Sequence, residues 1–347
     1  MRLALADSFT PVCPRCRAEG RPGAPLGLTG DRPNDAPVRH GRLLCPATEC
    51  GAVYPIIDGL AVLVPDLDRY LGDAAVYLLT RDDLPAETMD LIGAHLPANS
   101  FFDAARQHLS SYARDHYGAW DPEDASATPL PGSSWRLVEA GLARAGAVEG
   151  PVVELGCAAG GGCFRIAEQL GLPVLGLDLS APLIRLAQQV SERGSVRYPR
   201  RMAGTAYRDR AFPLPFAKRE LVDFWLADAL TPPLAAGSAG LVIAVNLVDC
   251  VQDPGRLIAT VADLLRPGGK AILATPFDWS VAATPRERWL GGRSAGEPPP
   301  SLVAALAGEA RLSMLAHESD LPWAIRLHER ATMNYRVELI LAERPVG

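Results

Sequence analysis

The sequence VVELGCAAGGG, from Val152 to Gly162, decides the fold that we predict for this chain. Its first four residues suit a buried strand, and its glycine-rich turn leads into Cys163–Leu170, which has helical periodicity. A second predicted strand, Val174–Asp178, ends in a carboxylate, and Ser180 is expected to cap the helix Ala181–Glu192. A strand, a glycine turn, a helix and an acidic strand end form a nucleotide-binding unit, because glycines let the backbone approach the ligand.

The residues around this turn narrow the choice of nucleotide. Asp178 lies 22 residues after Gly156, near the spacing at which a carboxylate receives ribose hydroxyls. The turn has Gly156, Ala158 and Gly160 at alternating positions, which differs from the G-x-G-x-x-G of dinucleotide-binding proteins. Glu154 precedes the turn, where a carboxylate repels a pyrophosphate but suits a cationic methionine moiety. A glycine-rich turn without any ligand is the alternative.

This turn resembles motif I of class I S-adenosylmethionine-dependent methyltransferases, E-x-G-x-G-x-G, with Ala158 in place of the middle glycine. The resemblance implies an α/β fold with a Rossmann-like sheet, parallel with one antiparallel strand. The predicted strand Val222–Leu226 is followed by Ala227-Asp228-Ala229, which resembles the acidic loop of this family. There Asp228 would accept the adenine amino group and Ala229 would donate its backbone N–H. The implied cofactor-binding residues are Glu154, Gly156, Ala158, Gly160, Asp178, Leu179, Asp228, Ala229 and Asn246.

A later strand end supplies the candidate catalytic residues. Leu241–Val245 is predicted as a buried strand that ends at Asn246, with Asp249 shortly after it. Ligands of open α/β sheets bind beyond the carboxyl ends of strands, so we expect Asn246 and Asp249 to face the reaction. Asp249 would orient or deprotonate the substrate, although a structural cap of the following segment is equally compatible with its position. Arg266–Lys270 is predicted as a turn before the strand Ala271–Ala274.

The C-terminal part carries a second resemblance, which rests on Asn246–Asp249, Pro276–Trp279, Thr284-Pro285, Trp289–Gly292, Pro322–Arg326 and Arg330. These pieces are similar to the methyltransferase domain of ovothiol biosynthesis, which N-methylates 4-mercaptohistidine. The resemblance implies a small histidine-like or amino-acid-derived substrate. Arg326 or Arg330 can pair bidentately with a carboxylate, and Trp279, Trp289 and Trp323 can supply aromatic walls. Core packing of the tryptophans and a loop contact of Arg326 are the alternatives.

Four cysteines near the N-terminus form two close pairs. Two residues separate Cys13 from Cys16, and four separate Cys45 from Cys50. Two such turns complete a tetrahedral four-thiolate site, the arrangement that zinc prefers, and a closed site of this kind is structural. Seven cysteines in this pattern favour metal binding in a reducing cytoplasm over disulfides. Two unrelated loops with free cysteines are the alternative.

The segment around these cysteines has a resemblance of its own. Leu43–Pro46, Cys50-Gly51 and Tyr54–Leu60 are similar to the zinc-ribbon family that contains the small activator subunit of tRNA and protein methyltransferases. We therefore divide the chain into a zinc ribbon (1–65), a helical linker or cap (66–135) and a methyltransferase domain (136–347).

Two further segments have open interpretations. Phe101–Tyr117 has apolar residues at helical spacings and is expected to be either a cap over the cofactor or a helix that packs the ribbon against the core. His108 and His116 within it are expected to be solvated or hydrogen-bonded. Ser195–Glu220 carries seven basic and two acidic residues, and we expect a mobile, solvated insertion there, with RNA contact as the alternative.

Composition limits the partners. The chain has 347 residues and a formal charge of −6, which argues against nucleic acid and anionic membranes as general partners. No signal peptide or membrane-spanning run is apparent, so we expect a cytoplasmic protein with a small-molecule substrate. The oligomeric state stays open. The leading prediction is an N-methyltransferase of a small metabolite, and the alternatives are an RNA methyltransferase and a non-catalytic scaffold that activates a partner.

Overall fold

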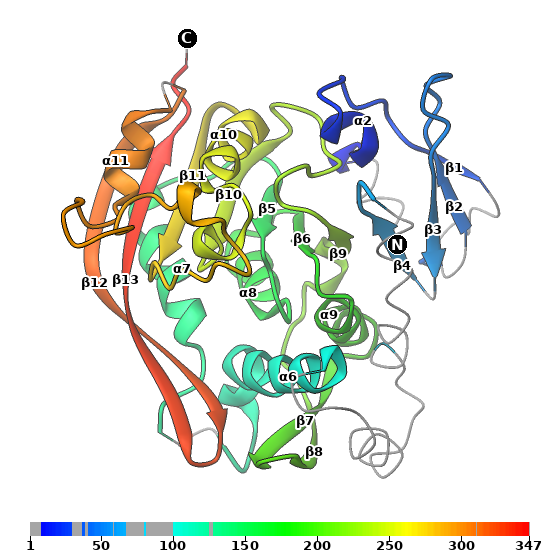
Figure 1. Ribbon diagram of the computed structural model, residues 1–347. Helices are drawn as coiled ribbons and strands as arrows, with labels where there is room; N and C mark the ends of the chain where they lie inside the picture. The colour runs from blue at the N-terminus through cyan, green and yellow to red at the C-terminus, as the bar shows by residue number, and fades with distance from the viewer. Residues whose placement is uncertain are drawn as a thin grey trace.

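The computed structural model describes residues 8–29, 37–38, 41–57, 59–66, 80, 100–124, 128–309 and 311–346. Eleven strands form one sheet in the order β1-β2-β3-β4-β9-β6-β5-β10-β11-β13-β12, with the N-terminal strands at one edge and the β12–β13 pair at the other (Figure 1). From β9 to β12, only β13 runs antiparallel to its neighbours, as predicted. These seven strands are β9 (Val222–Ala227), β6 (Val174–Asp178), β5 (Val152–Leu155), β10 (Ala239–Val245), β11 (Leu265–Thr275), β13 (Ala331–Glu343) and β12 (Ser313–His328).

Helices cover both faces of this sheet, and the apolar strands alternate between two cores. Val152 points into the core under the first group of helices and Val153 into the core under the second, because successive side chains of a strand face opposite sides. No helix in the described ranges is both long and apolar enough to cross a bilayer. The first group is α6 (Phe101–Tyr117), α7 (Ser133–Ala145), α8 (Gly161–Leu170) and α9 (Ala181–Arg193), and the second is α10 (Pro254–Leu264) and α11 (Leu302–Ala307).

Two local predictions need correction. Ser180 does occupy the N-cap position of α9, but its side chain makes no capping hydrogen bond. Its backbone N–H instead donates to Asp178 Oδ1 at 2.8 Å, because the aspartate forms a tight turn at the strand end. The turn expected at Arg266–Lys270 is part of β11, where Gly268 has φ +75° and donates its N–H to the Arg344 carbonyl.

The cysteine-rich segment continues the sheet. β4 pairs in parallel with β9 through Val62 and Leu63, so the ribbon strands extend the edge of the sheet. Phe9 meets Trp225 edge to face at 6.5 Å, and both side chains are completely buried. The ribbon therefore shares its core with the sheet. Its elements are α2 (Pro14–Ala18), β1 (Gly27–Thr29), β2 (Gly41–Leu44), β3 (Val53–Ile57) and β4 (Leu60–Leu63).

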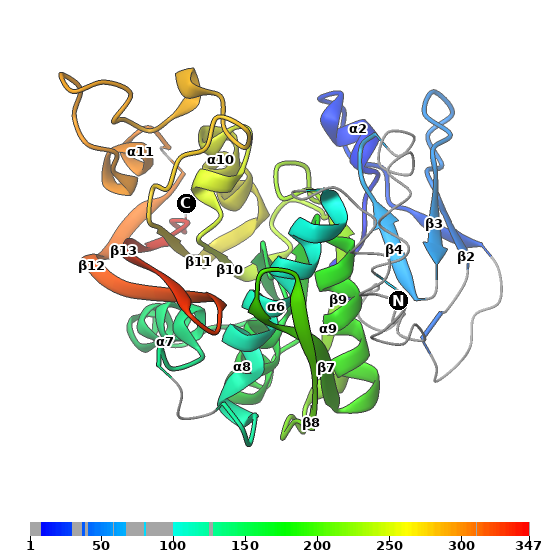
Figure 2. The ribbon, with the colours of Figure 1, turned by 60° about the horizontal axis from the view of Figure 1, so that its bottom comes forward.

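The segment expected to be a mobile insertion is a β-hairpin, β7 (Ser195–Ala203) and β8 (Ala206–Pro213), which lies along α6 (Figure 2). Three of its arginines, Arg200, Arg201 and Arg210, are held by side chains of neighbouring elements. The backbone N–H of Arg201 donates to Ser110 Oγ at 2.7 Å, and Arg210 forms a buried pair with Asp121. The basic residues therefore fix the hairpin, which composition alone could not indicate.

A single buried carboxylate links three elements of the fold. Asp124 is 1 % exposed and pairs with Arg114 of α6 at 2.6 Å, with Arg326 of β12 at 2.9 Å and with Arg200 of β7 at 3.5 Å. Removing one partner of a buried ion pair leaves an uncompensated charge, which is far costlier than losing an exposed pair.

We predict that Asp124→Ala lowers the free energy of unfolding by about 3–5 kcal/mol, since guanidinium groups would stay buried without their counter-charge. Denaturant unfolding followed by circular dichroism measures the change. Arg197→Ala is the control, because Arg197 pairs with Asp209 on the surface and its loss should cost at most about 1 kcal/mol. Equal effects of the two substitutions would contradict the importance of the buried cluster.

Candidate functional site

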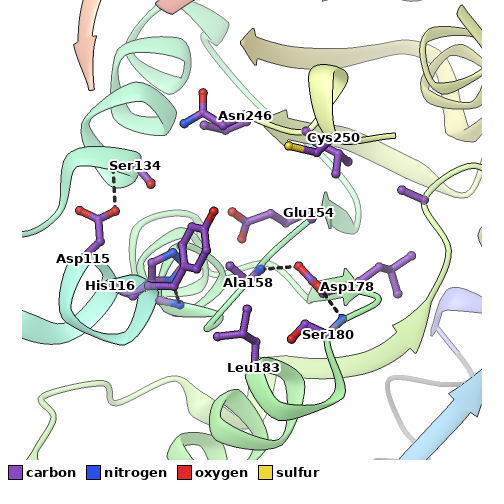
Figure 3. Close-up of a pocket in the computed structure, with 18 of the residues that line it drawn as sticks. Asp115, His116, Ser134, Glu154, Ala158, Asp178, Ser180, Leu183, Asn246 and Cys250 are labelled. Carbon is purple, nitrogen blue, oxygen red and sulfur yellow. Dashed lines mark hydrogen bonds between the residues drawn. The ribbon is translucent and has the colours of Figure 1, made fainter. Parts of the chain in front are cut away.

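A cavity of about 280 Å³ lies beyond the carboxyl ends of the parallel strands. Its floor is formed by the ends of β5, β6, β9 and β10, and α6 and α7 close one side (Figure 3). The predicted residues that line it are Glu154, Gly156, Ala158, Asp178, Leu179, Asp228, Ala229, Asn246 and Trp323.

The turn after β5 has the backbone that its glycines allow. Gly156 and Gly160 have φ of +70° and +79°, and Ala158 adopts +46°. Gly160 does not line the cavity, contrary to its predicted place among the cofactor contacts. A Cβ built there would lie 2.5 Å from the Phe224 ring, so this glycine serves close packing of the turn on the sheet.

Asp178 holds the turn in place. Its Oδ2 accepts the Ala158 N–H at 2.9 Å, and its Oδ1 accepts the Ser180 N–H at 2.8 Å (Figure 3). Burial raises the pKa of this carboxyl group, and the backbone hydrogen bonds oppose that shift. A carboxylate has about four acceptor sites, more than these backbone N–H groups use, so Asp178 can still accept a hydroxyl group of a ligand in the cavity.

Glu154 places a second carboxylate in the cavity. It is 7 % exposed and accepts the Cys163 thiol at 2.9 Å, a partner that the sequence did not indicate. Burial raises its pKa to about 7, so near neutral pH the empty site holds a carboxyl group that a nearby cation would ionise. Figure 3 shows the carboxylate pointing into the space between Asn246 and Ala158.

Asp228 and Asn246 complete the polar lining at the neighbouring strand ends. Asp228 Oδ1 accepts the Leu230 N–H at 2.8 Å, and burial raises the pKa of the carboxyl group. Asn246 has φ +54°, and both polar atoms of its side chain are buried without a partner in the described part of the chain. Buried amide groups are normally hydrogen-bonded, so this side chain is available to a ligand.

Asp249 does not line the cavity. It is 2 % exposed, and its Oδ2 accepts the Asp278 N–H at 2.6 Å while its carbonyl accepts the Thr284 hydroxyl at 3.2 Å. These contacts agree with the alternative role of Asp249 as a cap of the following segment. Its carboxylate holds the loop after β11 through the Asp278 N–H.

Of the five candidate substrate residues, only Trp323 lines the cavity. Trp323 reaches the cavity, stacks on Tyr335 at 4.8 Å and donates its Nε1–H to Ser134 Oγ. Trp279 and Trp289 stack on each other at 5.8 Å, outside the lining. The two arginines are also outside it: Arg326 is paired with Asp124 and Glu329, and Arg330 is exposed between β12 and β13.

Helix α6 contributes residues to the cavity that were not among the predicted site residues. His108, Tyr112 and His116 line the cavity from successive turns, so α6 is a wall of the site. His116 Nδ1 accepts the Gly161 N–H at 2.8 Å, and burial lowers its pKa to about 4, so this ring is neutral. Asp115 accepts the N–H groups of Ser133 and Ser134 and caps α7. The four-residue spacing of the three rings was a signal in the sequence.

The four N-terminal cysteines also come together. Their sulfur atoms all lie within 4.8 Å of one another, with 3.7 Å between Cys13 and Cys50 and 3.9 Å between Cys16 and Cys45. A tetrahedral zinc ion with bonds of about 2.3 Å separates its sulfur ligands by about 3.8 Å. The cysteine cluster is therefore compatible with the predicted zinc ribbon.

Comparison with known proteins agrees with this geometry. Residues 153–273 match the family described as a methyltransferase domain. The chain contains a methyltransferase domain. The norajmaline N-methyltransferase of Rauvolfia serpentina is 23% identical over 165 residues, which are 46% of this chain and 49% of that protein. The methyltransferase GfsG of Streptomyces halstedii is 27% identical over 177 residues, 50% and 55% of the two chains.

The chain thus spans about half the length of these curated relatives. Among solved structures, geranyl diphosphate C-methyltransferase from Streptomyces coelicolor A3(2) is similar with a TM-score of 0.42 and 15% identity, over 61% of this chain and 76% of that one.

We predict that the chain binds zinc and that Cys16→Ser loses it and melts at a lower temperature. Metal binding supplies several kcal/mol to a ribbon with so small a core of its own. Metal analysis and thermal unfolding test this, with Cys250→Ser as the control, since Cys250 lies outside the cluster. Full zinc content in the Cys16→Ser protein would contradict the assignment.

A second prediction concerns Glu154, whose pKa in the folded protein is about 7 against an ordinary value of 4.5. Burial penalises only the ionised form, so its cost is absent below about pH 4.5, grows from there to about pH 7 and is of order 3 kcal/mol at about pH 8. Glu154→Gln should therefore stabilise the empty protein at pH 8 and leave stability unchanged at pH 4.5.

Urea unfolding at the two pH values measures this difference for Glu154→Gln. The matched control is Glu149→Gln, whose side chain is 81% exposed and should show no such pH-dependent gain. A Glu154→Gln gain that is the same at both pH values would show that burial of the charge is not its cause.

Proposed function

We propose that this chain is an S-adenosylmethionine-dependent N-methyltransferase acting on a small histidine-like or amino-acid-derived metabolite. One observation carries the proposal: Glu154, Asp178 and Asp228 line a single cavity at the carboxyl ends of three neighbouring strands. Such an acidic lining repels the pyrophosphate of a dinucleotide and suits a nucleoside that bears a sulfonium and an ammonium group. The match of residues 153–273 to a methyltransferase domain supports the same choice.

The residues have separate tasks in this proposal. Asp178 accepts the ribose hydroxyls, Asp228 accepts the adenine amino group, and the Ala229 N–H donates to the adenine ring. Glu154 attracts the ammonium group, which favours its ionised form. The unpartnered side chain of Asn246 binds the cofactor or the substrate beside it. When bound, S-adenosylmethionine supplies an electrophilic methyl carbon, so the protein has mainly to align a nucleophile and exclude water.

A small nitrogen nucleophile is supported by several observations. The norajmaline enzyme and phosphoethanolamine N-methyltransferase 1 of Arabidopsis thaliana, 28% identical over 123 residues, are both named N-methyltransferases. Trp323, which lines the cavity and is backed by the stacked Tyr335, offers an aromatic wall suited to a flat ring such as imidazole. An RNA substrate has less support, because Arg200 and Arg210 of the hairpin are already paired with the buried carboxylates of Asp124 and Asp121.

Proton transfer depends on the form of the acceptor. A neutral imidazole nitrogen attacks without a base, whereas a protonated amine must first lose a proton. His108 lies in the lining, and burial lowers its pKa, so it is neutral near pH 7 and can accept that proton. In this proposal His108 takes the task that the sequence suggested for Asp249.

The cysteine cluster is proposed to hold a structural zinc ion. Cys13, Cys16 and Cys45 are buried and Cys50 is partly buried, so the four thiolates fill the coordination sphere and leave no position for substrate. Zinc would stabilise the ribbon and, through the pairing of β4 with β9, the edge of the catalytic sheet.

We expect isothermal titration to detect S-adenosylmethionine binding, and labelled S-adenosylmethionine to transfer its methyl group to histidine derivatives but not to total RNA. Asp178→Ala should bind at least about 100-fold more weakly, because two hydrogen bonds to a charged acceptor are lost. The control is Asp209→Ala, which alters a carboxylate outside the cavity. Absence of binding by the unmodified protein would favour a non-catalytic scaffold. Methylation of RNA alone would favour an RNA methyltransferase.

A further inference from the structure

A separate hollow, which we call the outer hollow, lies on the surface beside the cavity. It measures about 360 Å³, and the residues that line it include Trp120, Trp135, Arg165 and Phe216. Trp135 and Arg165 also line the cavity, so these two side chains lie between the two spaces. The proposed function makes no use of the outer hollow, although its volume falls within the range of small-molecule sites, about 300–1,000 Å³.

Aromatic rings form the apolar part of the outer hollow. Phe216 is 6% exposed, stacks on Phe164 at 4.9 Å and meets Trp120 edge to face at 5.0 Å. Trp120 and Trp135 are half-buried, so each keeps part of its side chain open to solvent. Rings that are already fixed by neighbouring rings can receive a flat ligand with little further loss of side-chain entropy.

A guanidinium group without a counter-charge lies beside these rings. The guanidinium carbon of Arg165 is 4.4 Å from the ring centre of Trp120 and 5.4 Å from that of Trp135. Within the described ranges this group has no hydrogen bond or ion pair, and its Nε is buried without an acceptor. Asp115 and Glu139 act on its charge from a distance only. A guanidinium has five donors, so those of Arg165 are available to a ligand.

A second guanidinium group lies near the first. A Cβ built on Gly132 would lie 3.8 Å from Arg165 Nη2 and 3.7 Å from Arg136 Nη1, so the two cations meet at the start of α7. Arg136 donates to the carbonyls of Pro131 and Leu130, and in the described part of the chain it forms no ion pair. Two like charges that are close together repel each other, and a bound anion would relieve this repulsion.

The indole N–H groups of the outer hollow are further donors without partners. The indoles of Trp225, Trp289 and Trp323 each donate a hydrogen bond. Those of Trp120 and Trp135, by contrast, meet no acceptor among the described residues. The unused polar groups on the aromatic walls are therefore donors, which suit a ligand with acceptor atoms.

The lining that the described residues form contains one carboxylate, and this carboxylate is already engaged. Glu168 Oε1 accepts the Lys218 N–H at 2.6 Å, and the Lys218 ammonium group donates to the Glu168 carbonyl at 3.0 Å. The nearby ammonium group offsets part of the negative charge of Glu168. The carboxylate of Glu168 thus does not neutralise Arg165.

We propose that the outer hollow is a binding site for a small aromatic carboxylate, whose ring lies against Trp120 and Trp135 while its carboxylate pairs with Arg165. The planar fork of a guanidinium matches a carboxylate with two parallel hydrogen bonds. Arg136 adds positive charge to the same region, and the indole N–H groups can donate to the ligand. This site is distinct from the cavity and does not depend on the proposed function.

The indole N–H resonances of protein labelled with ¹⁵N-tryptophan test this site, because each of the six tryptophans gives one signal. We expect 2-naphthoate to shift the signals of Trp120 and Trp135, with a Kd of about 1 mM or tighter for a ligand of this size. The neutral 2-naphthamide should bind at least about 10-fold more weakly, because it cannot form the charged pair. Trp120→Phe and Trp135→Phe assign the two signals.

Substitutions of Arg165 test its part in binding. Arg165→Met should lose the preference for 2-naphthoate over 2-naphthamide. Arg165→Lys keeps the charge without the fork and should bind 2-naphthoate with intermediate affinity, which keeps the test valid if Arg165→Met does not fold. The matched control is Arg197→Met, because Arg197 pairs with Asp209 on the surface and lies outside the lining. This control should bind both ligands as the unmodified protein does.

Trp323 reports whether the anion enters the cavity instead, because this residue lines the cavity and not the outer hollow. Shifts of Trp135 and Trp323 without a shift of Trp120 would place 2-naphthoate in the cavity and overturn the proposal. Equal binding of 2-naphthoate and 2-naphthamide would show an apolar patch, and absence of any shift would show no site, so either result also overturns it. S-adenosylmethionine takes no part in these titrations, so their outcome leaves the proposed function untouched.

Discussion

The site depends on the two hydrogen bonds that Asp178 accepts from Ala158 and Ser180. They join the turn after β5 to the turn after β6, so the ends of two parallel strands form one rigid edge. Ala158 at φ +46° is strained for a residue with a side chain, and a charged acceptor offsets that cost. Because the same carboxylate keeps acceptor sites toward the cavity, one residue both shapes the turn and faces the ligand.

Around this edge, the fold concentrates acidic groups that water would otherwise stabilise. Burial raises the pKa of Glu154, Asp178 and Asp228, which means that the empty cavity resists holding three ionised carboxylates. A ligand with positive charge relieves this cost when it binds. The electrostatic penalty is thus a source of selectivity.

The parts of the fold and site that are formed by neighbours along the chain could be predicted from the sequence. The glycine turn, the acidic strand ends and the two cysteine pairs are local patterns, and the parallel sheet with its antiparallel β13 follows from the resemblance they carry. Contacts between residues that are distant in sequence could not be predicted in this way. Arg326 meets Asp124 across 202 residues, so no spacing could show that this arginine is consumed by an internal ion pair. Helix α6 was predicted, but its three cavity rings face the site only because the hairpin and β12 hold the helix there.

The N-terminal ribbon explains how the far edge of the sheet is completed. All six residues of β9 are buried, and an apolar strand of this kind at an open edge would expose unpaired N–H and C=O groups and invite aggregation. β4 covers that edge by parallel pairing, while Arg17 donates to the Leu234 carbonyl at 2.7 Å. Leu234 follows shortly after Asp228, so contacts of the ribbon reach the loop after β9 that begins at the cavity. A metal that fixes Cys13 at the N-cap of α2 and Cys16 within this helix would therefore stabilise both the sheet edge and this loop. The ribbon is in this way a structural part of the sheet that carries the cavity.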